Sequence, residues 1–431
     1  MHEFTDMGLS PGRLGVVPVT SDTLPRMSFV NLPCHRLEPG KPVPFNIWDG
    51  RGKLLIRKGD PVESVEHQDF LASHNASVTQ ADFRAWERSY NRLIYERFRQ
   101  GATMGELERS YMPSEILEAD YVTGYDIPGG WVDLYEVLMG VLYQGTAART
   151  PLDRLEGVQQ RATELLTDSA DNSLFALFQL MADRSLGYCA KHALLAAVLC
   201  ELTACKLGVA EPIRPVLFRA ALTMNIGMAR QQDVMVRQKT PLSAEQKELI
   251  KEHPQIGVEI LRTLGVFEED WLELVATHHA PHDPTGTDPK QELTRILSMA
   301  DQFIAKVSAR ATRAALPTRS ALRFMVAQPE AALLRVGSAM TAVVGLYPPG
   351  TYVTLSNGEI AVVVRRGETP TTPVTVSFMN ADGVGLGLYM ARDPSDKAVT
   401  IQASLPSDRV KFALDTEKIQ RALKRAGTAA T

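Results

Sequence analysis

The chain has 431 residues and a mass of 47.4 kDa, which exceeds one ordinary globular core and predicts two or three domains. Hydrophobic residues make up 45% of the chain and charged residues 22%, whereas a disordered chain would carry fewer apolar groups and more net charge. The formal net charge is −4, whereas a protein that binds nucleic acid along its backbone carries a surplus of positive charge. The composition therefore indicates a folded protein that does not coat nucleic acid.

No targeting or membrane feature stands out in the sequence. We expect no membrane span, because no apolar run approaches the roughly 18 residues that one requires. The N-terminus lacks the charged and apolar regions of a signal peptide. The four cysteines form no CxxC pair and are too few for a disulfide scaffold. These observations predict a cytoplasmic protein.

The N-terminal part of the chain predicts a small α+β module. Two apolar runs within residues 42–59 flank Asp49 and Gly50, a dipeptide that tolerates the positive φ of a tight turn. This stretch therefore predicts a β-hairpin. From Gln80 to about Gly101 the apolar residues follow a helical spacing among many charges, which predicts a long surface helix.

The centre of the chain predicts almost only helices. Leu186–Leu207 has apolar residues at helical spacing and is followed by Gly208, a residue suited to a left-handed cap. Ser243 and Gln246 fit a capping box, and Pro254 predicts a kink or break in the helix that they start. Further helices are expected from Pro212, over Glu268–His279 and over Gln291–Ser308.

Beyond Leu346 the pattern changes to strands and turns. Residues 350–364 predict two strands joined at an Asn-Gly turn. The GxGxG spacing of Gly383–Gly387 is not followed by a helical pattern, so we expect a β-turn rather than a dinucleotide site. Further strands are expected over Pro373–Phe378 and Lys397–Ile401, and a helix over Asp415–Ala426 that ends at Gly427.

The predicted fold class is mainly α, with a small α+β module before a helical bundle and a small β-rich extension after it. The expected boundaries are a loose tail over residues 1–25, the α+β module over 26–110, a connector over 111–150, the helical domain over 151–325 and the β-rich extension with a terminal helix over 326–431.

Histidines and one aspartate in the helical centre are the candidate site. His192 lies in mid-helix, His253 in a later helix, His278 and His279 at a helix end, and Asp301 in a further helix. Imidazoles and carboxylates that several helices bring together bind iron, manganese or zinc. Each histidine alone is better explained as a helix cap or as one partner of a buried hydrogen bond. As an ordered set they resemble a known pattern.

This ordered set resembles the HD-GYP family, helical metal-dependent phosphodiesterases that hydrolyse cyclic di-GMP. The resemblance covers about residues 186–310 and extends weakly to residues 346–359 and to the hairpin. It implies an HD-type bundle, a divalent metal ion (iron, manganese or zinc), and cyclic di-GMP, signalling proteins or a second copy of the chain as partners. The matching blocks are, in order, the helix with His192, Asn225-Ile-Gly227, Lys239–Glu245, His253-Pro-x-x-Gly257, His278-His279 and Ala300-Asp301.

Several positions depart from the family pattern. Met224 and Asn225 stand where the family has the His-Asp pair whose Asp bridges two metal ions. A neutral amide supplies no negative charge to balance two cations, whereas a carboxylate does. A thioether is a poor ligand for iron(II) or manganese. Met228 replaces a family Lys, and Tyr188 replaces a family Glu.

The family signature His-His-Glu-x-x-Asp-Gly-x-Gly-Tyr-Pro is also altered. It begins with His278-His279 and retains Asp283 and Gly286, but its last three residues read Gly286-Thr287-Asp288. The family uses this loop for specificity and partner contacts.

These departures leave three interpretations. The first is a degenerate member that binds cyclic di-GMP or a protein partner without hydrolysis, and for it we assign no catalytic residue. The second is a weak phosphodiesterase with a single ion at His253, His278 and His279, since His192 and Asp301 belong to the half that Met224 interrupts. The third is a helical scaffold in which the histidines are incidental.

A run of arginines follows the candidate ligands along the chain. They either form a solvated face or contact phosphates. We favour the solvated face, because binding a phosphate requires several guanidinium groups to point towards one position, which a sequence does not show. The run consists of Arg310, Arg313, Arg319 and Arg323.

Overall fold

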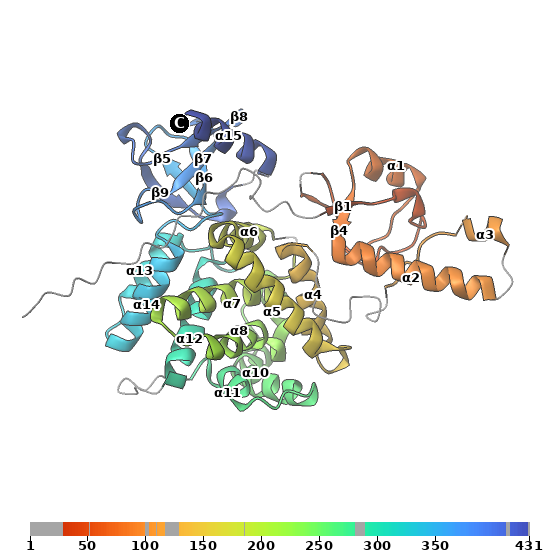
Figure 1. Ribbon diagram of the computed structural model, residues 1–431, viewed down its shortest axis with the longest axis horizontal. Helices are drawn as coiled ribbons and strands as arrows, with labels where there is room; N and C mark the ends of the chain where they lie inside the picture. The colour runs from red at the N-terminus through yellow and green to blue at the C-terminus, as the bar shows by residue number, and fades with distance from the viewer. Residues whose placement is uncertain are drawn as a thin grey trace, which may run out of the picture.

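The computed structural model describes residues 29–50, 52–99, 103–108, 110–116, 129–184, 186–280, 289–410 and 414–429. The fold is mainly α, as predicted: a helical bundle carries an α+β module beside it and a β unit at one end (Figure 1). The tail expected over residues 1–25 lies outside the described residues.

The N-terminal module is a four-stranded sheet in the order β1-β4-β2-β3, packed against helices. The predicted hairpin is present, because Ile47 pairs with Ile56 in antiparallel register on either side of the turn. Phe45 and Trp86 meet edge to face at 5.1 Å in the module's core. The elements are β1 (Phe29–Asn31), β2 (Ile47–Trp48), β3 (Leu54–Ile56), α1 (Val65–Ser73), β4 (Ser77–Thr79), α2 (Gln80–Arg99) and α3 (Met104–Glu108).

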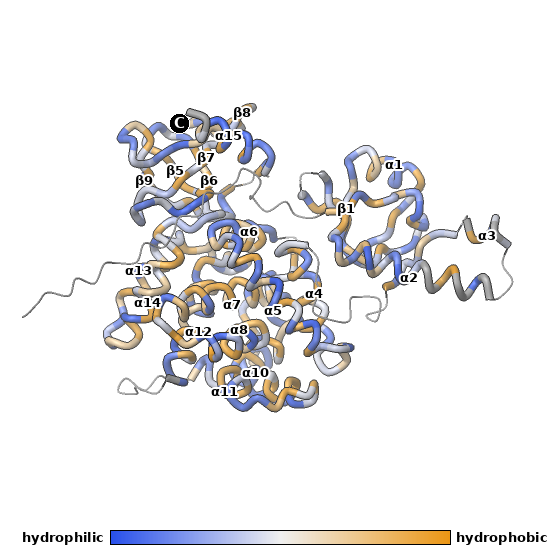
Figure 2. Tube along the Cα trace, viewed as in Figure 1, coloured by the Kyte–Doolittle hydropathy of each residue, from blue (hydrophilic) through white to orange (hydrophobic). Residues whose placement is uncertain are grey.

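The bundle surrounds one apolar helix, α7 (Tyr188–Leu207), which contacts α4, α6, α8, α9, α12 and α14. Its largely apolar course is visible in Figure 2. The other helices are α4 (Trp131–Gln144), α5 (Pro151–Asp168), α6 (Ala170–Ala182), α8 (Arg214–Thr223), α9 (Ala229–Arg237), α10 (Ala244–Thr263), α11 (Glu269–Thr277), α12 (Pro289–Val307), α13 (Thr318–Val326) and α14 (Ala331–Val344).

Helix α7 is long and apolar enough to cross a membrane by length and composition, contrary to the expectation that no segment is. However, 83% of its most apolar window is buried inside the protein, as in the core helix of a globular domain.

Local signals in the bundle are partly confirmed. Ser243 and Gln246 form the predicted capping box, and Gly208 ends α7 with a φ of 78°. Helix α10 continues through Pro254, so Pro254 does not break it. The expectation of a connector is wrong, because those residues contain α4, whose apolar side belongs to the main core.

The C-terminal β unit is an antiparallel sheet in the order β8-β7-β6-β5-β9. Its first hairpin is as predicted, with Gly358 at a φ of +83°. Residues expected as a strand form instead a short 3-10 helix at Lys397–Val399, β8 begins within the glycine-rich stretch, and the last helix runs through Gly427. The elements are β5 (Tyr352–Leu355), β6 (Ile360–Arg365), β7 (Val374–Met379), β8 (Gly385–Arg392), β9 (Ile401–Leu405) and α15 (Thr416–Ala429).

The α+β module docks on α4 through buried polar groups. The amide of Asn46 donates to Glu136 at 2.8 Å, and the backbone N–H of Ala81 donates to Asp133 at 3.2 Å. Burial raises the pKa of Asp133 from 3.8 to about 6, and burial together with the charge of Asp82 raises that of Glu136 above its usual 4.5. The contact therefore favours protonated carboxyl groups.

This contact predicts that stability falls with rising pH. A carboxyl group whose pKa is raised on folding is most favourable below its unfolded pKa, and its contribution is lost as the pH rises towards the folded value. Glu136→Gln keeps the oxygen that accepts from Asn46 and removes the charge. We expect it to raise the free energy of unfolding near pH 8 by on the order of 1 kcal/mol and to flatten its fall above about pH 5, measured by urea unfolding. Identical pH profiles for wild type and variant would contradict this, and the exposed Glu156→Gln is the control.

Candidate metal centre

Three histidines from two neighbouring helices converge at the end of the bundle formed by α10 and α11. The ligand atoms of His253, His278 and His279 all lie within 4.8 Å of one another, and the two Nε2 atoms of His253 and His278 are 3.2 Å apart. His253 and His278 are fully buried, whereas the side chain of His279 is 44% exposed. The cluster is therefore closed by protein on one side and open on the other.

Backbone carbonyl groups determine which nitrogen of each buried imidazole carries the proton. The Nδ1 atom of His253 lies 2.6 Å from the carbonyl oxygen of Ile250, which can only accept, so Nδ1 carries the hydrogen. That carbonyl is free of its usual helical partner because Pro254, four residues later, has no N–H. His278 makes the same contact with the carbonyl of Val275 at 2.7 Å, in the last turn of α11.

The buried nitrogens that remain are suited to a cation. Burial lowers the pKa of His253 to about 4 and that of His278 to about 3, so both rings are neutral near pH 7. With hydrogen on Nδ1, each Nε2 presents a lone pair, and the two lone pairs face one another. Neutral imidazole nitrogens arranged in this way are the donor set of zinc, iron or manganese, so the residues fit a divalent ion.

The other candidate ligands are already hydrogen-bonded to each other. His192 Nε2 lies 2.9 Å from Asp301 Oδ1, and the hydroxyl of Tyr188 lies 2.9 Å from His192 Nδ1. Since the Asp301 carboxylate only accepts, Nε2 carries the hydrogen and Nδ1 accepts from Tyr188. Burial alone would raise the pKa of Asp301, but the bond from His192 and the nearby imidazoles hold it well below its usual range. Asp301 Oδ2 is 4.0 Å from His279, so it joins the two groups of residues.

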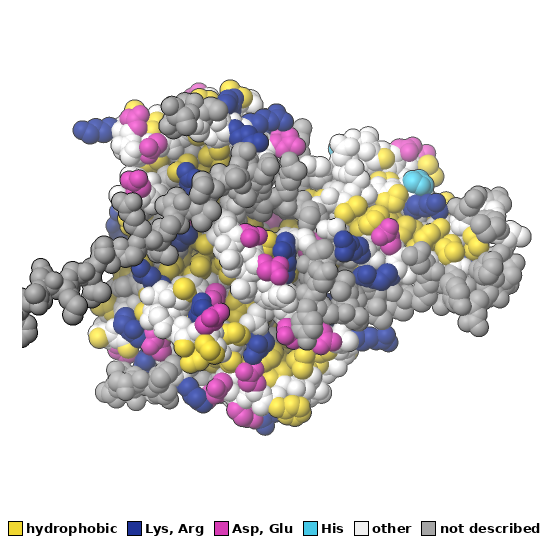
Figure 3. Space-filling view, in the orientation of Figure 1, with side chains coloured by type: hydrophobic (Ala, Val, Ile, Leu, Met, Phe, Trp, Pro, Cys, Tyr) yellow, Lys and Arg dark blue, Asp and Glu magenta, His cyan; other side chains and the backbone are white. Residues whose placement is uncertain are grey.

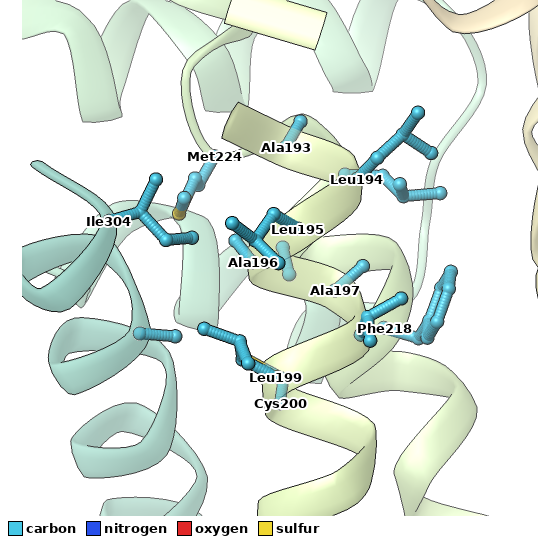
Figure 4. Close-up of a cluster of buried hydrophobic side chains, with 14 of the residues drawn as sticks. Ala193, Leu194, Leu195, Ala196, Ala197, Leu199, Cys200, Phe218, Met224 and Ile304 are labelled. Carbon is cyan, nitrogen blue, oxygen red and sulfur yellow. The ribbon is translucent and has the colours of Figure 1, made fainter. Parts of the chain in front are cut away.

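The pair Met224 and Asn225 lies at the end of α8, beside these residues. Met224 is fully buried, and Figure 4 shows it in an apolar cluster with Ala193, Ala196 and Ile304. Asn225 is 2% exposed, and neither of its amide atoms has a hydrogen-bond partner among the described residues. The thioether is therefore part of the core, and the amide is a buried polar group without compensation.

A tight backbone contact explains two of the sequence blocks. A Cβ atom on Gly227 would lie 2.3 Å from the carbonyl oxygen of His253 and 2.8 Å from the nitrogen of Gly257. The turn after Asn225 therefore packs directly on α10, one turn of which carries His253 and Gly257. The two glycines place the α8 end and the α10 histidine next to each other.

The first turn of α7 is held by a residue that sequence reasoning missed. Asp233 of α9 accepts from the backbone N–H groups of Tyr188 at 2.8 Å and Cys189 at 2.7 Å. The hydroxyl of Tyr143 from α4 donates to its other oxygen. Asp233 thus caps the helix that carries His192, as a carboxylate at a helix N-terminus does. Its long sequence separation from α7 left no local signal.

A cavity of about 480 Å³ opens beside the candidate ligands, within the size range of small-molecule sites. His192, His279, Asp301 and Asn225 line it on one side. Its cationic lining residues, apart from histidine, are Lys239 and Arg310. The cavity therefore combines the polar cluster with positive charge.

Within the arginine run, Arg310 lines the cavity, Arg313 donates to the carbonyl of Ala305, and Arg319 donates to Tyr347 at 3.4 Å. On the face shown in Figure 3, basic and acidic side chains are interspersed. The signature-loop residues Asp283, Gly286, Thr287 and Asp288 lie outside the described residues.

Comparisons with known proteins bear on the central region. Residues 170–332 match the HD domain family. The 3'3'-cGAMP-specific phosphodiesterase 3 of Vibrio cholerae serotype O1 (strain ATCC 39315 / El Tor Inaba N16961) is 28% identical over 166 residues, which are 37% of this chain and 36% of that protein. The solved structure of Bd1817, an HDG"Y"P protein from Bdellovibrio bacteriovorus, aligns with a TM-score of 0.40 at 17% identity, over 73% of this chain and 99% of that chain.

The central helices thus form an HD domain. Its ordered motif blocks, from His192 to Asp301, resemble those of the HD-GYP family. The match spans about a third of the Vibrio relative's length.

The close backbone contact at Gly227 predicts that any side chain at this position destabilises the protein. Gly227→Ala is expected to lower the free energy of unfolding by about 1–3 kcal/mol, because its Cβ meets backbone atoms that cannot rotate away. Gly427→Ala in α15 is the matched control, since nothing lies within 4 Å of its Cβ, and we expect it to stabilise by up to about 1 kcal/mol. Urea unfolding measures both, and equal effects of the two variants would contradict the steric explanation.

Proposed function

We propose that the protein is a degenerate HD-GYP module that binds a cyclic dinucleotide beside a one-ion metal site and does not hydrolyse it efficiently. The observation that carries the proposal is the difference between the two halves of the site. His253, His278 and His279 present converging nitrogens, whereas His192 and Asp301 are paired with each other and Met224 is part of the core.

The metal would be held by the three histidines, with Asp301 close to His279. A bound divalent ion supplies Lewis-acid polarisation of a phosphate oxygen. Two ions together would lower the pKa of a water and stabilise the leaving oxygen. This arrangement needs ligands in both halves of the site, one half for each ion. Here the second half offers the uncharged amide of Asn225 in place of a bridging carboxylate.

The cavity and the Vibrio relative, which is named a 3'3'-cGAMP-specific phosphodiesterase, support this ligand class. A cavity of about 480 Å³ accommodates a small molecule of nucleotide type. Lys239 and Arg310 would contact its phosphates, since ammonium and guanidinium groups bind phosphate oxygens through charge-assisted hydrogen bonds.

A second function is supported by the intact histidine cluster. One ion on His253, His278 and His279 is sufficient for a slow metal-dependent phosphodiesterase, because a single cation still polarises a phosphate. This alternative and the first proposal differ only in turnover. A helical scaffold differs from both, since it would bind no metal.

Turnover is tested with the purified full chain, loaded with manganese or iron(II) under reducing anaerobic conditions. Cyclic di-GMP and 3'3'-cGAMP are incubated with the protein, and linear product is separated by chromatography. We expect bound nucleotide and bound metal but no product above that of the variant carrying His278→Ala and His279→Ala. Product above this control would establish the phosphodiesterase, and a chain that binds neither metal nor nucleotide would leave only the scaffold.

Restoring the family pair predicts a gain of metal. Met224→His together with Asn225→Asp adds a nitrogen ligand and a bridging carboxylate next to His192 and Asp301. We expect the metal content per chain to rise from one towards two, measured by elemental analysis after dialysis. Met224→Leu is the control, because it changes the core packing without adding a ligand. Unchanged metal content would show that the backbone no longer holds the family geometry.

A further inference from the structure

A second cavity lies between the bundle and the β unit, and no feature of the metal centre accounts for it. It measures about 90 Å³, room for a few waters or one small oxyanion. The start of α7, the end of α9, the end of α12 and the turn after β9 line it. Both parts of the protein therefore contribute to its wall.

Three cations line this cleft. Lys191 on α7 is 3% exposed, and its ammonium group donates to the carbonyl of Asp183. Arg237 at the end of α9 donates one N–H to the carbonyl of Leu186 at 3.1 Å, and Arg184 lies before α7. Lys191 also interacts with the carboxylates of Asp183 and Asp233, so its own charge is partly compensated. Three cations against the one carboxylate of the lining leave the cleft with a surplus of positive charge, which an anion stabilises.

One acidic side chain faces the same space. Asp408, in the turn after β9, lines the cleft, and its buried Oδ1 has no hydrogen-bond partner among the described residues. The N–H groups of Tyr188 and Cys189 at the start of α7 are taken by Asp233, so they are not ligand donors. The cleft thus offers several donors on cations and one buried oxygen that needs a donor.

We propose that this cleft binds one inorganic phosphate ion, whose oxygens accept from Lys191, Arg184 and Arg237 and whose remaining P–OH donates to Asp408. Hydrogen phosphate keeps an O–H throughout the neutral range, and sulfate has none. A phosphate monoester loses its second proton near pH 6, so it also lacks an O–H near pH 8. A carboxylate repels an oxyanion that has no O–H to donate to it. We therefore expect the cleft to bind inorganic phosphate more tightly than sulfate or a phosphate monoester.

The test is equilibrium dialysis of the full chain against radiolabelled phosphate near pH 8, with sulfate and methyl phosphate as competitors. We expect one phosphate per chain and competition by either anion at least about tenfold weaker than by unlabelled phosphate. Asp408→Asn should reduce this discrimination to less than about threefold, because an amide also donates to sulfate. Arg184→Gln and Lys191→Gln should weaken phosphate binding about tenfold or more, and Lys251→Gln on exposed α10 surface should leave it unchanged.

Several results would overturn the proposal. These are the absence of binding at about 10 mM phosphate, equal competition by sulfate, or unchanged discrimination in Asp408→Asn. Phosphate binding that His278→Ala removes and Arg184→Gln does not would assign the ion to the metal centre instead. Arg184 is exposed and Asp408→Asn preserves shape, so these two variants test the site even where the buried Lys191→Gln fails to fold.

Discussion

The nearly complete burial of α7 is the constraint on which the rest of the structure depends. Other helices cover it on several sides, and residues 193–200 have no more than 1% exposure. A polar group on such a helix requires a partner within the protein, because water does not reach it. His192 is therefore paired with Tyr188 and Asp301, and Lys191 with a carbonyl. Helix α7 thus contributes one polar side chain to each space, His192 to the candidate site and Lys191 to the second cleft.

The two halves of the candidate metal centre differ in how their histidines are paired. In one half, the backbone carbonyls of Ile250 and Val275 hold the protons of His253 and His278 on Nδ1 and leave Nε2 free for a cation. In the other half, the free nitrogen of His192 is taken by Tyr188, and Met224 fills the adjacent space with a side chain that packs like its apolar neighbours. Met224 therefore fits the core without a ligand, whereas the buried amide of Asn225 beside it has no hydrogen-bond partner among the described residues.

Much of the fold could be predicted because its signals are local. The capping box at Ser243, the left-handed Gly208 and the turn at Gly358 each specify backbone geometry within a few residues. Helix α4 was missed because Asp133 and Glu136 are typical of a solvated segment, and only the docked module buries them. Strand β8 was missed because its glycines weaken the strand pattern, and pairing with β7 compensates for them.

The site divides in the same way. The candidate ligands could be identified because they belong to ordered motif blocks, but their pairing could not. The bond between His192 and Asp301, the cap by Asp233 and the packing of Gly227 on α10 join residues far apart in the chain. Pro254 is instructive, because a residue that predicts a break instead frees the carbonyl that orients His253.

The position of Tyr188 has a consequence beyond its bond to His192. Its side chain lines the large cavity beside the histidines and also the small cleft below the β unit, together with Val236. Tyr188 is thus common to the walls of both spaces. A change of this one side chain would alter the lining of the histidine cavity and of the small cleft together, so binding in one space and binding in the other need not vary independently.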